Sequence, residues 1–165
     1  MQRVAEPRDG DERNILLSWL AFHRSALEAK CADLSAPQLA TRSVQPSALS
    51  LLGLVRHMTE MERVYAVWAL GPKSELTAVW GEYTDGGPEW DFDAGASQID
   101  ESLRAWRQER DSADVRIDAI QSLDEKGRGN GYSVRWNLLK LIGEYARHNG
   151  HADLIRERID GQTGE

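Results

Sequence analysis

The sequence predicts an all-α protein, specifically a four-helix bundle with one long connection between its second and third helices. Apolar residues recur three and four positions apart through four long stretches, which is the pattern of amphipathic helices. Glycine and proline gather between these stretches, most densely over residues 71–96. Short connections make the first and second, and the third and fourth, helices antiparallel neighbours. The long connection permits a crossover, so we expect up-down-down-up topology.

The first half of the chain supplies two of these helices. Residues 1–10 are polar and are expected to form a loose arm. The first helix is expected over residues 11–33, on an apolar stripe of Ile15, Trp19, Phe22, Ala26 and Leu27. A connector with two prolines fills residues 34–47. Ser47 is the expected N-cap of a second helix over residues 48–70.

The second half begins with the long connection. Its aromatic residues indicate a loop packed against the bundle, either as a lid or pocket wall or as a plain crossover: Trp80, Tyr83, Trp90 and Phe92. A third helix is expected over 97–123, with Ser97 and Asp100 as a capping box. Residues 125–132 are expected to be a flexible turn. The fourth helix should follow an N-cap at Ser133 and run to Ile159. Residues 162–165 form a tail, and residues 1–165 are expected to be a single domain.

Composition excludes several classes of function. The chain has 165 residues and a net charge of −7, whereas proteins that bind nucleic acids or anionic lipids usually present a basic face. No apolar run approaches the length of a membrane span, and the N-terminus lacks the apolar region of a secretory signal. Cys31 is the single cysteine, which excludes a disulfide framework and favours a small packed side chain. We therefore expect a cytoplasmic protein.

Potential metal ligands gather in the fourth helix. Glu144, His148 and His151 are four and three residues apart, so they share one helix face, beside the apolar stripe. Buried carboxylates and imidazoles need partners, and a metal ion satisfies several of them at once. His57 lies among apolar residues of the second helix. It is either a core histidine bonded to a neighbour or a third ligand. His23 is expected to be merely packed or exposed.

A site formed by His57, Glu144 and His148 would have three protein ligands and one open position, as catalytic metal sites do. Nitrogen and carboxylate ligands suit zinc, nickel or iron, and zinc is the conservative choice. The chain contains no HExxH and no GxSxG motif, so a zincin or an α/β-hydrolase has no support. A di-iron bundle would need two Glu-x-x-His motifs, and here the pair is a single Glu-x-x-x-His.

Two stretches resemble a known family: RWNLLKLIGEYARHNGHADLIRERIDG over residues 135–161 and LLGLVRHMTEMERVY over residues 51–65. They are similar to the last and second helices of the DinB-like superfamily, in particular its mini-circle-protein branch, which is grouped with mycothiol-dependent enzymes. The resemblance implies an up-down-down-up bundle and a divalent metal.

That metal would be held by one histidine of the second helix and two residues of the fourth, which here are His57, Glu144 and His148. Glu144 stands where the typical motif has its first histidine, as in mycothiol-dependent maleylpyruvate isomerases. His151 stands at the motif's glutamine, which implies a role beside the metal in binding the cofactor or substrate. Lys140 occupies a position where relatives often carry histidine.

The resemblance implies an S-transferase or isomerase that uses a metal and a low-molecular-weight thiol, with mycothiol as the candidate. The alternative is a non-catalytic, metal-stabilised dimer that acts as a stress or small-molecule binding protein. We expect a homodimer in either case. The helices carry more large apolar residues than one small bundle needs, including Trp19, Trp68, Trp106 and Trp136. Of these, Trp68 and Trp136 are predicted core residues.

Overall fold

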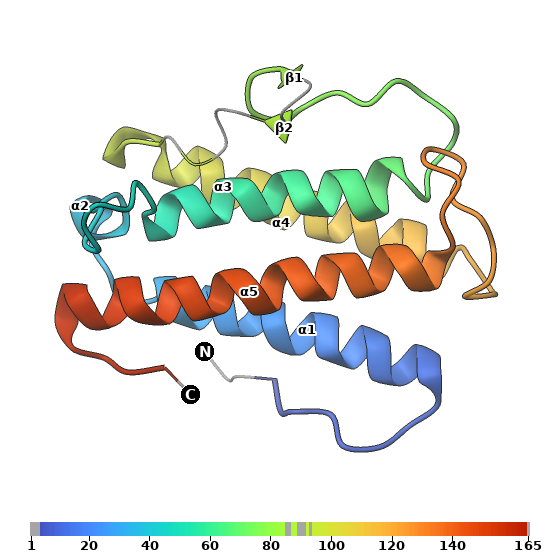
Figure 1. Cartoon of the computed structure of the whole chain (residues 1–165), viewed down its shortest axis with the longest axis horizontal. Helices are drawn as coiled ribbons and strands as arrows, with labels where there is room; N and C mark the ends of the chain where they lie inside the picture. The colour runs from blue at the N-terminus through green and yellow to red at the C-terminus, as the bar shows by residue number, and fades with distance from the viewer. Residues whose placement is uncertain (1–3, 85–86, 89–91, 93, 165) are drawn as a thin grey trace.

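The computed structural model describes residues 4–84, 87–88, 92 and 94–164. Long helices lie side by side in it (Figure 1), which confirms the all-α prediction. They are α1 (Glu12–Cys31), α3 (Leu51–Glu62), α4 (Ile99–Asp118) and α5 (Val134–Asp160). A π-helix, η1 (Arg63–Trp68), continues α3 without a break. The described strands, β1 (Tyr83–Thr84) and β2 (Gly87–Pro88), form one small antiparallel pair in the long connection.

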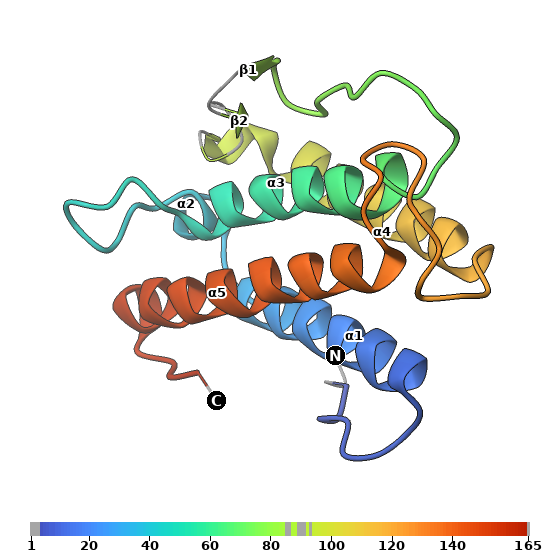
Figure 2. The same cartoon turned by 45° about the vertical axis from the view of Figure 1, so that its right-hand side comes forward.

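The helices pair differently from what the short connections suggested. The most extensive contacts join α1 to α5 and α3 to α4, and α3 also packs against α5 (Figures 1 and 2). Contacts between α1 and α3 are much fewer, although only a short connection separates them. A short connection limits how far apart two helices lie, whereas the apolar stripes decide which faces close on each other. No helix of the described chain is long and apolar enough to cross a membrane.

Every residue of α3 is buried, so this helix is the centre of the molecule. Its N-cap is Ser50, whose Oγ accepts a hydrogen bond from the Gly53 N–H at 3.1 Å. Ser47, the expected cap, instead accepts from the Leu49 N–H at 3.2 Å and closes a local turn. The helix therefore begins three residues later than the sequence suggested.

Other helix ends also differ from expectation. The connector over 34–47 contains the short helix α2 (Ala36–Leu39), and α1 ends at Cys31. A 3-10 turn, η2 (Ala96–Gln98), precedes α4, and here the Gly95 N–H donates to the Gln98 side chain at 3.0 Å. This contact replaces the expected pairing of Ser97 with Asp100, and α4 ends at Asp118 instead of Leu123.

The ends of α5 agree well with the prediction. Ser133 caps its N-terminus by accepting from the Trp136 N–H at 3.2 Å. Gly161 ends it in the left-handed region, at φ 78°, where glycine is favoured. The helix runs through Asn149-Gly150 without interruption.

A buried polar network ties the long helices together. Arg24 of α1 donates to both carboxylate oxygens of Glu62 at the end of α3, at 2.7 and 2.6 Å. The Tyr145 hydroxyl of α5 donates to Glu62 at 2.7 Å and accepts from the Trp106 indole of α4 at 2.8 Å. Burial lowers the pKa of Arg24, but Glu62, together with Tyr145 and Asp114, outweighs burial and raises it. Arg24 is therefore a charged group within the core.

The long connection is packed against α3 where it is described. The buried Glu60 carboxylate accepts from the backbone N–H groups of Val79 and Trp80, at 2.8 and 2.7 Å. The guanidinium of Arg56 lies 4.2 Å from the centre of the buried Trp80 ring. These contacts confirm the expected packed loop. Trp90 lies outside the described residues.

The turn over residues 125–132 is fastened to the end of η1, so the expectation of a flexible turn was wrong. The Gly129 N–H donates to the Ala69 carbonyl at 3.1 Å. A Cβ atom at Gly127 would lie 2.4 Å from that same carbonyl, which explains why glycine is needed there. The amides of Asn130 and Asn137 are joined at 2.8 Å.

Candidate metal centre

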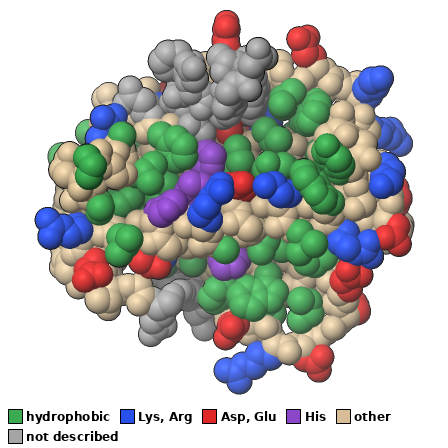
Figure 3. All heavy atoms as spheres, in the orientation of Figure 1, with side chains coloured by type: hydrophobic (Ala, Val, Ile, Leu, Met, Phe, Trp, Pro, Cys, Tyr) green, Lys and Arg blue, Asp and Glu red, His purple; other side chains and the backbone are tan. Residues whose placement is uncertain are grey.

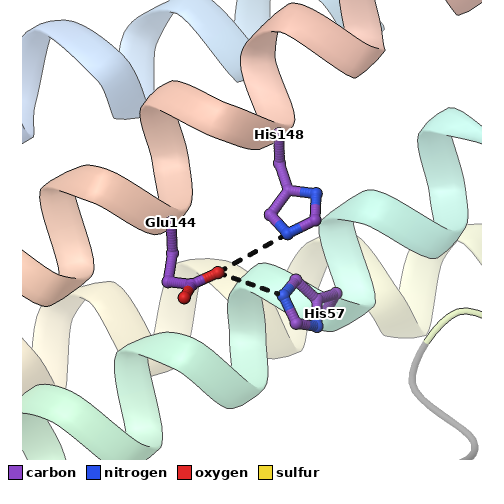
Figure 4. Close-up of side chains that lie close together, drawn as sticks. All are labelled: His57, Glu144 and His148. Carbon is purple, nitrogen blue, oxygen red and sulfur yellow. Dashed lines mark ion pairs between the residues drawn. The ribbon is translucent and has the colours of Figure 1, made fainter.

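The structure brings the three expected ligand side chains together at the seam between α3 and α5. His57 comes from α3, and Glu144 and His148 come from α5 (Figure 4). The Glu144 Oε2 atom lies 3.8 Å from His57 Nε2 and 3.6 Å from His148 Nε2. One potential ligand atom from each residue lies within 4.8 Å of the others, and all three residues are buried.

Helix geometry explains this convergence. Residues four apart in α5 are one turn apart, so Glu144 and His148 project from the same side of the helix. His57 projects from the fully buried α3, which packs against α5. Its imidazole is held from the other side by the Phe92 ring, stacked at a centroid distance of 4.4 Å. The long connection thus supplies one wall of the site.

The donor set fits a small divalent cation. With bonds of about 2.0–2.2 Å in a tetrahedron, neighbouring ligand atoms lie about 3.4 Å apart, close to the separations seen here. His148 Nε2 is buried and has no hydrogen-bond partner within the described chain. An unsatisfied buried nitrogen is costly, and a cation between the three residues would satisfy it. Two imidazoles and one carboxylate are a ligand set typical of zinc.

Basic side chains flank Glu144 on the solvent side. Lys140 Nζ lies 3.6 Å from Oε1 of Glu144, and the Arg147 guanidinium pairs with Oε2. Arg147 is exposed and Lys140 is partly exposed. In Figure 3, histidine, basic and acidic side chains lie together on this face of the molecule. Sequence reasoning had placed Lys140 one turn from Glu144 but had missed Arg147, because an arginine on a polar helix face carries no signal of its own.

His151 lies against His148. Their Nδ1 atoms are 3.2 Å apart, so one of the two nitrogens donates and the other accepts. Burial, followed by the neighbouring His57, Arg147 and His151, lowers the pKa of His148 to about 3. His148 is therefore neutral at physiological pH, which is the form that binds a metal.

The remaining candidates lie outside this cluster. His23 stacks on Trp19, and the Asn149 amide donates to its backbone carbonyl at 3.0 Å. Burial raises the pKa of the Cys31 thiol to about 12, so the thiol stays protonated, as expected of a packed residue. A cavity of about 290 Å³ lies elsewhere, between α1, the end of α5 and residues 162–164.

Two of the tryptophans depart from expectation in different degrees. Trp136 was predicted to be a core residue, but 38% of it is exposed, so that prediction was wrong. Its ring contacts Tyr65 and Tyr132 at the surface, whereas Val134 and Leu138 of the same helix enter the core. Trp68 is partly buried against the core, and its indole donates to the Ser74 carbonyl at 2.9 Å.

Fold and site together define a helical protein with a buried cluster of two histidines and one glutamate that could hold a metal ion. A family model, described as mycothiol-S-transferase, matches residues 15–161. The chain therefore belongs to the mycothiol-S-transferase family, within the DinB-like superfamily. Searches of curated proteins and of solved structures gave no match.

Proposed function

We propose that this protein is a metal-dependent S-transferase that joins the sulfur of mycothiol to an electrophilic carbon. The observation that carries the proposal is the convergence of His57, Glu144 and His148 at a buried seam in a chain of this family. The site also has an open side, since the partly exposed Lys140 and the exposed Arg147 border it towards solvent. An open coordination position is what distinguishes catalytic metal sites from structural ones.

Zinc is the cation we propose, held by the three residues above. A bound zinc ion would lower the pKa of a coordinated thiol and so supply a thiolate nucleophile at neutral pH. The residues around the ligands have supporting roles. In the proposed metal-bound form, His148 donates its Nδ1–H to Nδ1 of His151, 3.2 Å away, and binds the metal through Nε2. Lys140 holds the second oxygen of Glu144, which orients that carboxylate.

The reaction balances simply. A carbon–sulfur bond forms between the thiolate and the electrophile, the leaving group departs with the bonding electron pair, and the thiol proton is released to solvent. Phe92 stacks on His57 and limits the access of water to the buried side of the site. A thiol-assisted isomerisation would use the same thiolate.

The first test is thiol consumption by the zinc-loaded protein. With mycothiol and a chromogenic aryl halide, the zinc-loaded protein should form the thioether, and metal-free protein should not. Glu144→Gln should reduce the rate by at least about tenfold, because it removes a charged ligand. His23→Ala is the matched control, since His23 lies outside the cluster and its substitution should leave the rate unchanged. Mycothiol that binds tightly and is never consumed would contradict the proposal and favour a non-catalytic binding protein.

The architecture we propose for the whole chain is one DinB-like domain with up-down-down-up topology. The pairings of α1 with α5 and of α3 with α4, and the long connection between η1 and α4, support it.

We also expect a homodimer formed by helix faces. Trp106 is fully buried within one chain and so does not contribute to an outer surface. The partly buried aromatic side chains of Trp19 and Phe22 lie together on α1, on a face that a second copy would cover. Sedimentation equilibrium should give twice the chain mass. A monomer mass at all concentrations would refute the dimer.

A further inference from the structure

Three aromatic residues form an exposed cluster at the N-terminal end of α5, which we call the aromatic platform: Tyr65, Tyr132 and Trp136. The Tyr132 and Trp136 rings lie 4.3 Å apart, and Tyr65 meets Trp136 edge-on at 6.0 Å. Tyr132 is 53% exposed and Trp136 is 38% exposed, while Tyr65 is half-buried. Exposed apolar surface costs solubility, so a compact cluster of it usually marks a binding surface.

Each ring of the platform is held by local structure. Tyr65 lies in the π-helix η1, and single π-helical turns within α-helices occur frequently at functional sites. Tyr132 ends the turn that is fastened to η1, and its carbonyl accepts from the Gly127 N–H at 2.8 Å. Trp136 lies in the first turn of α5, capped by Ser133. Because its rings are already held in place, the platform loses little conformational entropy when a ligand binds.

The platform and the candidate metal centre lie on one line. Trp136, Lys140 and Glu144 are successive residues four apart on α5, so one turn separates each from the next. Lys140 links the two ends, because its Nζ lies 5.7 Å from the Tyr65 ring centre and 3.6 Å from Glu144 Oε1. Trp136 and Glu144 are about 12 Å apart along the helix axis. In Figure 3, hydrophobic side chains continue this line beyond the charged ones.

We propose that the aromatic platform binds the sugar end of mycothiol while the thiol lies at the metal centre, an inference that rests on the proposed function. Mycothiol carries its thiol on an acetylated cysteine and, at the other end, two linked six-membered rings, a glucosamine and an inositol. The C–H faces of such rings pack on aromatic rings. The tyrosine hydroxyls, the Trp136 N–H and the Lys140 ammonium supply hydrogen-bonding groups for their hydroxyls.

The first experiment uses the thiol-free probe, the glucosaminyl-inositol itself, with the protein as it is purified. Nuclear magnetic resonance should show the Trp136 indole N–H signal shifting on titration. That signal is identified by its loss in Trp136→Phe. The indole signals of buried Trp106 and of Trp68 should stay unchanged. Because this probe has no sulfur, the result does not depend on any reaction at the metal. An unchanged Trp136 signal would overturn the platform.

The second experiment compares thiols on the zinc-loaded protein by calorimetry. Trp136→Ala should weaken mycothiol binding about five- to tenfold, the effect of one aromatic contact, and Trp136→Phe should restore most of it. Binding of N-acetylcysteine, which has the thiol but no rings, should be unchanged in both variants. Leu154→Ala removes another exposed apolar side chain from the same helix, one that is 57% exposed, and is the matched control, expected to bind both thiols as the unaltered protein does.

The outcomes separate the platform from the proposed function. If Trp136→Ala weakens the binding of both thiols equally, or leaves the affinity for mycothiol unchanged, the platform is overturned even if S-transfer proceeds. Binding of the glucosaminyl-inositol at Trp136 would support the platform even if S-transfer failed. A dimer that dissociates in Trp136→Ala, together with a Trp136 signal that responds to protein concentration and not to the sugar, would overturn the platform and assign this surface to a second copy of the chain.

Discussion

His57→Ala is expected to weaken metal binding by at least about a hundredfold, more than is typical for loss of a residue that only orients a ligand. His57 is the member of the proposed ligand set that comes from α3, so its removal leaves Glu144 and His148 on one short arc of α5. Two ligands from one helix cannot surround a tetrahedral ion. Metal content after dialysis and competition with a chelator measure the loss.

Folding should survive this substitution, because the core is built from apolar residues that need no metal. Far-ultraviolet circular dichroism checks that the helices remain. Lys140→Ala is the matched control on the rim. It removes a cation 3.6 Å from Glu144 and no proposed ligand, so metal stoichiometry should stay the same. Full occupancy in His57→Ala, or loss of metal in Lys140→Ala, would show that the ligand set is wrong.

Glu62→Ala is expected to lower the free energy of unfolding by about 3–5 kcal/mol, because it leaves a charged group buried without its partner. Glu62 is fully buried, and its carboxylate accepts from Arg24 on both oxygens and from the Tyr145 hydroxyl. Burial, followed by Glu62, raises the pKa of Tyr145 well above its ordinary value, so this hydroxyl stays protonated and donates. Urea denaturation measures the change.

Asp114→Asn is the matched control for this network. Asp114 pairs with the same Arg24 at 2.7 Å, but its side chain is 56% exposed, and solvent screens the pair. Its loss should cost less than about 1 kcal/mol. A second comparison is the double variant Arg24→Met with Glu62→Leu, which removes both charges and should recover most of the stability lost in Glu62→Ala. If Asp114→Asn and Glu62→Ala lower the free energy of unfolding by similar amounts, burial does not determine how much each ion pair contributes to stability.

The Glu62 network and the candidate metal centre occupy neighbouring parts of the same seam. Tyr145 follows Glu144 in sequence but points into the core, where it bonds Glu62, while Glu144 points towards His57. Successive residues of a helix project about 100° apart, so α5 presents a structural contact and a candidate ligand at the same level. Because the Glu62 network joins α3 to α5, Glu62→Ala should also weaken metal binding.

The sequence by itself determined the helical class, the approximate extent of the long helices and the candidate ligands of α5. Helical periodicity is a local property, and so are the caps at Ser133 and Gly161. The spacing of Glu144 and His148 on one helix face also follows from local geometry alone. His57 required more than spacing, because an apolar stripe around a histidine is equally consistent with a packed core residue. The resemblance to relatives supplied the assignment of His57 to the same site as Glu144 and His148.

Only the tertiary structure decided which helices pack together, which distant residues enter the site and which tryptophans are buried. The partners of each helix depend on which apolar faces close, and for that reason α1 lies along α5 although α3 is nearer in sequence. Phe92 and Arg147 enter the site from positions that carry no motif. The burial of Trp106 and the exposure of Trp136 have the same cause, since two equally apolar residues differ only in what packs over them. Contacts between residues distant in sequence are set by three-dimensional packing, and a linear pattern does not contain that information.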